Sequence, residues 1–422
     1  MQQTGNYRWR ICGLLFFATT INYIDRQVLG LLAPQLQEVF QWTEKDYGYI
    51  IMSFQIAYAI GLLVTGRFLD KFGVRIGYSL AVGVWSLAAG AHALASSVIG
   101  FAAARFGLAL GESANFPAAI KTVSEWFPKK ERAFATGIFN SGSTIGAILA
   151  PALIPWMAIH WGWQWAFIIT GLLGIIWLIF WLPFYRQPCE TKGLSEKELN
   201  HIESDRETEV NISIPWSRLL TYRQTIGICL GRFVTDPVWW FFLYWLPKYL
   251  YTGHGTDLQA MALPLIIIYA LSSMGGIGGG WLSSHLIKTG RSIDDARKTS
   301  ILIVALMVVP IFFLSYFSNL WVAVALISLA TAAHQGWASN IFTVVSDIYP
   351  KNVVGSMTGL AGFAGAIGGI IFSPLVGFIL DATHSYYLVF AIASCAYLLA
   401  WAFLKIFIPK IEPLKILNIK SY

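Results

Sequence analysis

The amino-acid sequence predicts an all-α integral membrane protein with twelve transmembrane helices in two six-helix bundles. Of the 422 residues, 56% are hydrophobic and only 12% are charged, whereas an ordinary soluble domain has roughly 25% charged residues. Apolar runs of about 20 residues, long enough to cross the hydrocarbon core of a bilayer, recur almost from end to end. Motifs of the first half return in the second half, which indicates two related bundles. This composition excludes soluble enzymes. The net charge of +7 does not indicate a nucleic-acid-binding protein, because basic residues are typical of the cytoplasmic loops of a membrane protein.

Charged residues and segments rich in proline or glycine divide the chain into twelve candidate helices. Their expected ranges are 10–33, 47–69, 76–96, 99–122, 133–156, 165–185, 224–250, 259–287, 299–316, 319–345, 353–380 and 384–408. The first could be mistaken for a signal peptide. We interpret it as the first transmembrane helix, because Asp25 and Arg26 interrupt its apolar run and no small-residue cleavage site follows.

The distribution of basic residues predicts the orientation of the chain. Only Lys45 and Lys248 fall in expected outer loops. The other basic loop residues all lie on one side if both termini are cytoplasmic: Arg8, Arg10, Arg67, Lys71, Arg75, those between Lys121 and Arg132, those within 186–223, those between Lys288 and Lys298, Lys351, and those between Lys405 and Lys420. Cytoplasmic loops carry an excess of lysine and arginine, so both termini are expected in the cytoplasm.

One long polar segment, residues 186–223, separates the two halves. Ser195 and Glu198 have the spacing of a helix capping box, which predicts a short surface helix. The predicted domains are therefore a bundle of residues 1–185, a cytoplasmic linker of residues 186–223 and a second bundle of residues 224–422.

The two halves contain matching motifs at one constant offset. The sequence S-E-W-F-P-K at 124–129 returns as S-D-I-Y-P-K at 346–351, and T-G at 136–137 returns as T-G at 358–359, each 222 residues later. Because an even number of spans separates the copies, both have the same orientation in the membrane.

Several motifs resemble those of the major facilitator superfamily and, within it, of the anion:cation symporter family. The superfamily signature G-x-x-x-D-[RK]-x-G-x-[RK] is matched at 66–75, and its equivalent after the eighth span, at 280–284, is a weak copy. The family resemblance rests on N-Y-I-D-R at 22–26, R-F-G-L-A-L-G-E-S-A-N-F-P-A at 105–118 and W-F-P-K-K-E-R-A-F-A-T-G-I-F-N-S-G at 126–142, while R-F-V-T-D-P-V-W-W at 232–240 and A-H-Q at 333–335 look most like bacterial hexuronate transporters.

This resemblance implies a secondary active transporter that takes up a carboxylated sugar, such as galacturonate or glucuronate, with protons by alternating access. It also implies a multi-pass protein of the bacterial inner (plasma) membrane that is driven by the proton gradient and requires no cofactor. The expected partners are a small organic anion, protons and the lipid bilayer, and the expected state is a monomer.

Six charged residues lie within apolar spans. They are Asp25, Arg26, Arg105, Glu112, Arg232 and Asp236. Charged side chains at the centre of a span are costly and usually face a bundle interior or a wet cavity. The structural alternative is that they only hold helices together, and this alternative is strongest for Arg232 and Asp236, which can pair at i and i+4 on one helix.

The chemistry of these side chains predicts an anion site. Arginine stays charged and can bind a carboxylate through two parallel hydrogen bonds, so Arg26 and Arg105 are candidates for binding the substrate. In the family, the arginine of the fourth span is associated with the substrate carboxylate, and Arg105 occupies that place. The resemblance assigns proton coupling to Asp25 and Glu112, which can bind and release protons in a desolvated site.

Polar residues within other spans are candidates for binding sugar hydroxyl groups. They are His334, Gln335, Ser339 and Asn340 in the tenth span, and Tyr23, Tyr58 and Asn140 in the first half. Hydrogen bonds between helices are the alternative interpretation. The resemblance adds weight to Tyr23 and Tyr58, because tyrosines at matching places line the site in the family.

Two further patterns predict structure rather than chemistry. Asp70, Lys71, Arg75 and Arg132 are expected to form cytoplasmic salt bridges that stabilise one conformation, with a solvated loop as the alternative. The glycine run 275–280 follows no strand, so it indicates close helix packing rather than a dinucleotide site.

Other functions remain open to different degrees. The substrate could be another organic anion, such as galactonate, glucarate or a glutamate-like compound. An antiporter is less favoured, because antiporters of the superfamily usually have G-P in the fifth span, where this chain has Gly142 and Ser143. A membrane enzyme or sensor is not expected, because no soluble catalytic domain and no metal-ligand cluster is recognised in the sequence.

Overall fold

In a computed structural model, residues 5–191, 193–204, 216–349 and 351–414 are described. Every regular element within these ranges is a helix. The helices form two compact units. The first comprises the described residues of Met1–Glu209 together with Leu243–Ile266, and the second comprises those of Val210–Phe242 and Ile267–Tyr422. The predicted domain boundaries at 185 and 223 stay a prediction.

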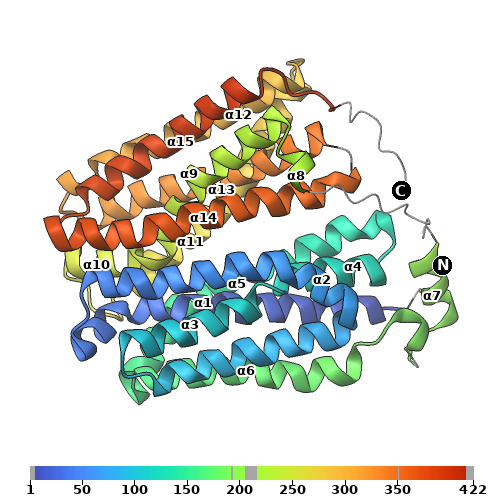
Figure 1. The fold of residues 1–422 in the computed structure, drawn as a ribbon, viewed down its shortest axis with the longest axis horizontal. Coiled ribbons are helices and arrows are strands. Elements are labelled where there is room, and N and C mark those ends of the chain that lie inside the picture. Colours follow the sequence, from blue (N-terminus) through green and yellow to red (C-terminus); the bar gives the residue numbers. More distant parts are fainter. Residues whose placement is uncertain (1–4, 192, 205–215, 350, 415–422) are drawn as a thin grey trace. The chain divides into compact units, whose positions relative to one another are not determined.

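The first unit is built around two groups of helices that run side by side, α1 with α5 and α2 with α3 and α6 (Figure 1). Its helices are α1 (Tyr7–Phe40), α2 (Glu44–Ala91), η1 (His92–Leu94), α3 (Val98–Glu112), α4 (Asn115–Trp126), α5 (Lys129–Trp161), α6 (Trp163–Phe184), η2 (Pro188–Glu190), α7 (Glu196–Glu203) and α10 (Leu246–His254).

Helix α2 covers both the second and the third predicted span. It begins at a capping box in which Thr43 and Asp46 bond each other's backbone N–H groups. At Gly73 the backbone leaves the helical conformation, with φ 72° and ψ 160°. Only glycine adopts such angles readily, so the G of the signature motif is what allows the chain to turn between the two spans.

The fourth predicted span is broken into α3 and α4. Helix α3 ends at Glu112, and α4 begins at Asn115. Near this break α3 lies very close to α2, because a Cβ atom at Gly111 would be 2.6 Å from the carbonyl oxygen of Ala81. The glycine therefore permits the approach that places Glu112 in the interior of the unit.

The second unit contains the equivalent long helices of the second half. They are α8 (Trp216–Leu219), α9 (Arg223–Tyr244), α11 (Ala262–Lys288), α12 (Ile293–Val308), η3 (Val309–Tyr316), α13 (Leu320–Ile348), α14 (Lys351–Thr383) and α15 (Tyr387–Phe407). The last two residues of α9 and the first five of α11 belong to the first unit. The glycine run packs as predicted, because a Cβ atom at Gly275 or Gly279 would overlap the backbone of α13 at Ala332 or Gly336.

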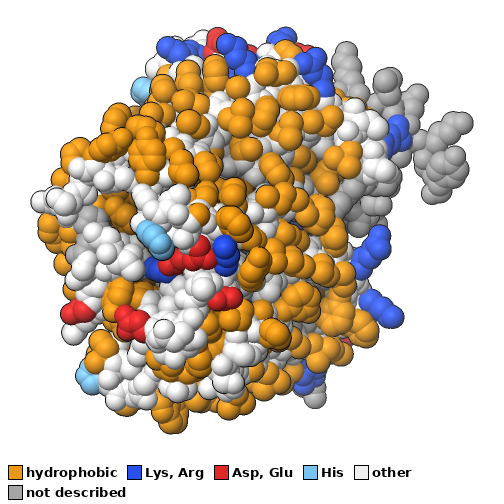
Figure 2. All heavy atoms as spheres, turned by 60° about the vertical axis from the view of Figure 1, so that its left-hand side comes forward, with side chains coloured by type: hydrophobic (Ala, Val, Ile, Leu, Met, Phe, Trp, Pro, Cys, Tyr) orange, Lys and Arg blue, Asp and Glu red, His pale blue; other side chains and the backbone are white. Residues whose placement is uncertain are grey.

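Ten segments of the described chain are long and apolar enough to cross a membrane. Two of the twelve predicted spans are not among them. The first, within α1, has Asn22, Asp25, Arg26 and Gln27 in its middle, and the fourth is divided between α3 and α4. The count of twelve and the cytoplasmic termini thus stay predictions. Large apolar side chains such as Leu87 (71% exposed), Ile99 (81%) and Ile277 (76%) point outward, and hydrophobic side chains cover most of the face in Figure 2. Such a surface suits lipid.

The predicted linker helix is present as α7. Ser195 caps it by accepting a hydrogen bond from the Glu198 N–H. The Glu198 carboxylate does not complete the capping box. It accepts instead from the backbone N–H groups of Tyr7 and Arg8 at the start of α1. Arg8 also bonds Glu131 of α5 at 2.8 Å, so this Arg8 cluster ties α7 to the beginning of α1.

Candidate functional site

A buried ion pair lies in the interior of the first unit. Arg26 of α1 donates from Nε to Oε2 of Glu112 at 2.9 Å, and the two side chains are 5% and 0% exposed. A second donor of Arg26 points to Asn22 at a longer distance of 3.4 Å. A charge-assisted bond without access to water is strong, and it neutralises both groups in this state. While Glu112 is ionised and in this position, another anion must compete with it for Arg26.

Three aromatic rings surround the guanidinium of Arg26. Its Cζ atom lies 5.0 Å from the ring centre of Tyr23, 5.0 Å from that of Tyr58 and 5.4 Å from that of Phe54. Rings at these distances attract a cation through their π faces. The rings thus stabilise the positive charge where water is excluded. Tyr23 and Tyr58, which the sequence selected as candidates for binding sugar hydroxyl groups, lie beside this arginine.

Arg105 of α3 joins the same group of side chains. It is fully buried, its Cζ atom lies 4.8 Å from the Phe54 ring, and its Nη2 donates to the backbone carbonyl of Arg26 at 2.7 Å. Its Nε and Nη1 have no hydrogen-bond partner among the described residues. A buried guanidinium with unused donors is suited to bind a carboxylate.

Asp25 lies in different surroundings from Glu112. It is buried, and neither of its carboxylate oxygens has a hydrogen-bond partner among the described residues. The hydroxyl group that faces it belongs to Thr170 of α6. On the same face of α6, a Cβ atom at Gly174 would meet the side chains of Trp85 and Ser86, whose polar atoms are likewise without partners. The two candidate proton carriers are therefore not equivalent, because only Glu112 is bonded to an arginine.

The polar residues of α13 point to different neighbours. Asn340 donates to the carbonyl of Gly279 at 3.0 Å and so makes the helix–helix hydrogen bond that was the structural alternative for it. Gln335 faces Gly276 of α11, and the Ser339 hydroxyl donates to a carbonyl of its own helix. His334 lies elsewhere: it stacks on Trp239 and bonds the Tyr397 hydroxyl at 2.6 Å.

Asn140 and the pair of Arg232 and Asp236 are the remaining candidates within the spans. The Asn140 side chain is exposed on α5, and among the described residues no hydrogen bond joins it to the Arg26 group. Arg232 and Asp236 form the expected pair within α9, with Nη2 and Oδ2 at 2.7 Å.

The predicted cytoplasmic salt bridges are not seen at the described side chains. Arg75 donates to the carbonyl of Leu182 at 2.8 Å, Arg132 donates to the carbonyls of Phe127 and Ser124, and Lys71 lies over the Phe72 ring. The side chain of Asp70 is outside the described residues. In the second unit, Arg297, which follows Arg75 by 222 residues, does pair with Asp347 at 2.9 Å.

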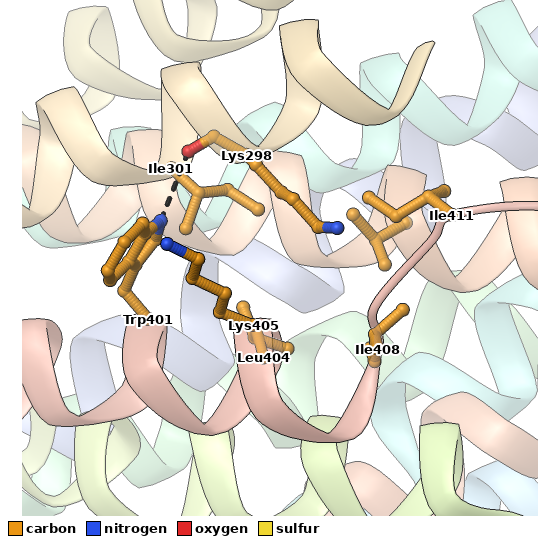
Figure 3. Close-up of a pocket in the computed structure, with 8 residues that line it drawn as sticks. Lys298, Ile301, Trp401, Leu404, Lys405, Ile408 and Ile411 are labelled. Atoms are coloured by element: carbon orange, nitrogen blue, oxygen red, sulfur yellow. Dashed lines mark hydrogen bonds between the residues drawn. The ribbon is translucent and has the colours of Figure 1, made fainter.

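A pocket at one end of the second unit does not fit the predicted chemistry. It lies between α12, α13, α15 and the chain after α15, and it is lined by Lys298, Ile301, Val344, Trp401, Leu404, Lys405, Ile408 and Ile411 (Figure 3). Lys298 is neutralised by Asp294 at 2.7 Å. The Trp401 indole donates to the Lys298 carbonyl at 3.2 Å, and the Lys405 ammonium lies over the Trp401 ring. The lining is otherwise apolar.

Sequence reasoning missed two aromatic residues that lie beside Arg26 or Arg105, Phe54 and Tyr244. Phe54 precedes Tyr58 by four residues, so helical periodicity alone places both on one face. Tyr244, whose ring lies 5.4 Å from the Arg105 Cζ atom, gave no such signal, because its segment folds with the first unit rather than with the second half to which it belongs in sequence.

Comparisons with known proteins agree with this arrangement. A family profile described as Major Facilitator Superfamily matches residues 15–373. The chain is 33% identical over 386 residues to the hexuronate transporter of Escherichia coli (strain K12), which covers 90% of this chain and 89% of that protein. It is 34% identical over 324 residues to the galacturonate transporter of Dickeya chrysanthemi, covering 75% of this chain and 94% of that protein.

Solved structures show the same fold. The crystal structure of a D-xylose-proton symporter superposes with a TM-score of 0.77 at 17% identity, covering 97% of this chain and all of that one. A bacterial homolog of the human lysosomal transporter Spinster superposes with a TM-score of 0.74 at 18% identity, with 96% of each chain covered. The predicted all-α membrane fold is confirmed.

Proposed function

Because the chain belongs to the Major Facilitator Superfamily, we propose that it takes up a hexuronate, such as galacturonate or glucuronate, together with protons by alternating access. The chain is a multi-pass membrane transporter and not an enzyme, related to transporters of hexuronates, galactonate and glucarate. Its bacterial relatives indicate the inner membrane. In this proposal the proton gradient supplies the energy, no cofactor is required, and a monomer is sufficient.

The observation that carries the proposal is the buried group of Arg26, Glu112 and Arg105. Two arginines share the Phe54 ring, and Glu112 is bonded to one of them, Arg26. The unused donors of Arg105 are supplied with a partner when a substrate carboxylate binds. A lipophilic cation, the substrate expected of a drug antiporter, would be repelled here.

Proton coupling follows from competition for Arg26. A proton on Glu112 removes its negative charge and weakens the bond to Arg26, which frees the guanidinium for the incoming anion. The proton therefore binds before the substrate. Asp25 is not bonded to an arginine, so its protonation acts through the Thr170 hydroxyl that faces it.

The remaining candidate residues complete the proposal. Tyr23, Tyr58, Asn140, His334, Gln335, Ser339 and Asn340 supply hydroxyl, amide and imidazole groups for the sugar. Asp70, Lys71, Arg75 and Arg132 control the cytoplasmic side, where the carbonyl contacts of Arg75 and Arg132 are exchanged for salt bridges in another conformation.

A second class of substrate is supported by the relatives. The chain is 30% identical over 396 residues to a probable galactarate/D-glucarate transporter of Bacillus subtilis. A dicarboxylate would occupy Arg26 and Arg105 with one group each. Galactonate and glutamate-like anions are further alternatives.

Uptake into proteoliposomes tests the proposal. Radiolabelled galacturonate or glucuronate is offered under an imposed pH gradient, with galactonate, glucarate and glutamate as competitors. We expect accumulation that collapses with a protonophore and competition by the other hexuronate. Uptake that ignores the gradient would refute proton coupling, and preferential competition by glucarate or galactonate would reassign the substrate.

A further inference from the structure

A charged pair in α9 lies inside a candidate transmembrane span of the second unit. Arg232 and Asp236 are bonded through Nε to Oδ2 at 3.0 Å and Nη2 to Oδ2 at 2.7 Å. Their side chains are 20% and 16% exposed. Charged residues within a span usually face a water-filled cavity or another functional surface, because lipid contact is costly.

The geometry of the pair leaves one acceptor and one donor group unused. Both hydrogen bonds end on the same oxygen, Oδ2 of Asp236. Within the described part of the chain, neither Oδ1 of Asp236 nor Nη1 of Arg232 has a hydrogen-bond partner. A pair that served only to hold one helix together would gain from using both carboxylate oxygens, as bidentate pairs do.

Arg232 and Asp236 both line a small pocket. It is lined by Arg232, Asp236, Trp337, Ala338, Ile341 and Phe342, and it has room for about one water-sized group. Room for the carboxylate comes from Gly365 of α14, where a Cβ atom would overlap Asp236 Oδ2. The Phe342 ring centre lies 5.4 Å from the Arg232 Cζ atom.

Trp337, which also lines this pocket, carries a third unused polar atom. Trp337 is 1% exposed, and its indole N–H has no acceptor among the described residues. Tyr397 packs edge-on against this ring, with centroids 5.6 Å apart, and its hydroxyl bonds His334. The indole is therefore held in position while its donor stays unused, which is costly for a buried N–H unless a ligand or water satisfies it.

The charges around the pocket decide which ligand group it can bind. An anionic group would meet the free Oδ1 of Asp236, and a cationic group would meet Arg232, so both are disfavoured. A hydroxyl group donates one hydrogen bond and accepts others. It can donate to Oδ1 of Asp236 while accepting from Arg232 or from the Trp337 indole, and its size fits the pocket.

We propose that Arg232, Asp236 and Trp337 form a subsite for one hydroxyl group of the transported sugar acid. This subsite distinguishes substrates by the presence and orientation of that hydroxyl. This proposal rests on the proposed function. The subsite differs from the α13 residues selected by sequence, because Trp337 packs near Gly231 of α9, whereas Gln335 and Asn340 meet Gly276 and Gly279 of α11.

The experiment compares galacturonate with analogues that each lack one hydroxyl, by competition against radiolabelled galacturonate. In the wild type, we expect one analogue to bind about tenfold more weakly or worse, because it leaves hydrogen-bonding partners of a charged group unsatisfied. In Asp236→Asn and in Trp337→Phe, galacturonate should bind more weakly, and the penalty for that same analogue should fall to within about twofold, because the interaction is already lost.

Asp294→Asn is the matched control. Asp294 also forms an i,i+4 pair in the second unit, with Lys298, and its side chain is similarly exposed, at 23%. This variant should keep the full penalty for every analogue. Trp337→Phe removes the N–H donor and leaves the Arg232–Asp236 pair in place, so it decides the question if Asp236→Asn fails to fold.

The outcomes separate this inference from the proposed function. If the wild type does not bind hexuronates, the proposed function fails. If it binds galacturonate but all analogues bind equally well, or if both variants keep the wild-type penalties and lose only thermal stability, the pair is a structural one and the hydroxyl subsite is refuted.

Discussion

Replacing Glu112 by glutamine tests the competition for Arg26 directly. The substitution keeps the length of the side chain and a hydrogen bond to Arg26 Nε, but it removes the charge. A hydrogen bond to a charged group contributes about 1.5–3 kcal/mol, and we expect the bond to Arg26 to lose roughly half of that strength when its acceptor loses the negative charge. The substrate carboxylate would therefore have about 0.75–1.5 kcal/mol less to overcome, which corresponds to a gain in affinity of about three- to tenfold.

The gain should depend on pH in a defined direction. At about pH 8, where Glu112 is ionised and bonded to Arg26 in the wild type, the variant should bind galacturonate more tightly. As pH falls, wild-type affinity should rise towards that of the variant, because protonation removes the competing charge. Binding is measured in detergent over a series of pH values, for example by tryptophan fluorescence.

Asp25→Asn is the control for this measurement. It also removes one buried carboxylate of the first unit, but Asp25 of α1 is not bonded to an arginine. Its affinity at high pH should stay at the wild-type value, although uptake driven by the pH gradient should fail in both variants. A Glu112→Gln variant that binds no tighter at about pH 8, or that keeps the wild-type pH dependence, would refute the competition.

Three further predictions concern other parts of the chain. Arg105→Lys should lose most substrate binding although the charge is kept, because an ammonium cannot form two parallel hydrogen bonds to a carboxylate, and wild-type affinity in an equilibrium binding assay would contradict this. Gly275→Ala should lower thermal stability by about 1–3 kcal/mol through overpacking against α13, whereas Gly278→Ala, where a Cβ atom meets nothing within 4 Å, should leave the melting temperature unchanged or raise it. Burial opposes ionisation of Glu131, but hydrogen bonds from Arg8 and His201 outweigh it and lower the pKa of Glu131 below its usual 4.5. The ionised Glu131 therefore stabilises the contact of α7 with α1 and α5 fully above pH 4.5, and this stabilisation is lost as pH falls through the lowered pKa. Hydrogen exchange of α7 should therefore accelerate in acid, and exchange rates independent of pH after correction for the intrinsic rate would exclude this role.

The sequence predicted the class of fold and most members of the charged group. Charges within apolar helices are rare, so Arg26, Arg105 and Glu112 could be recognised one by one. Their pairing could not be predicted, because helical periodicity relates residues within a helix and gives no information on partners 86 residues apart.

The separation of Asp25 from Glu112 illustrates the same limit. Adjacent residues on a helix point about 100° apart, so the sequence showed that Asp25 and Arg26 face different neighbours. Which of the two meets Glu112 depends on how α1 is rotated against α3, and that rotation is set by packing over the whole helix. The broken fourth span was also missed. Helix α3 ends at Glu112, directly after the close contact of Gly111 with α2, and a contact between helices cannot be read from the sequence.

The Glu198 carboxylate has a consequence for how the protein is made. It satisfies the first backbone N–H groups of α1, which lies 190 residues earlier in the chain. While the ribosome is still translating the first six helices, the start of α1 has no such acceptor, and the helix is completed only when α7 has been synthesised. A gene divided for expression as two fragments should therefore be cut after residue 204 and not at residue 185, so that the N-terminal fragment carries the carboxylate that its own first helix needs.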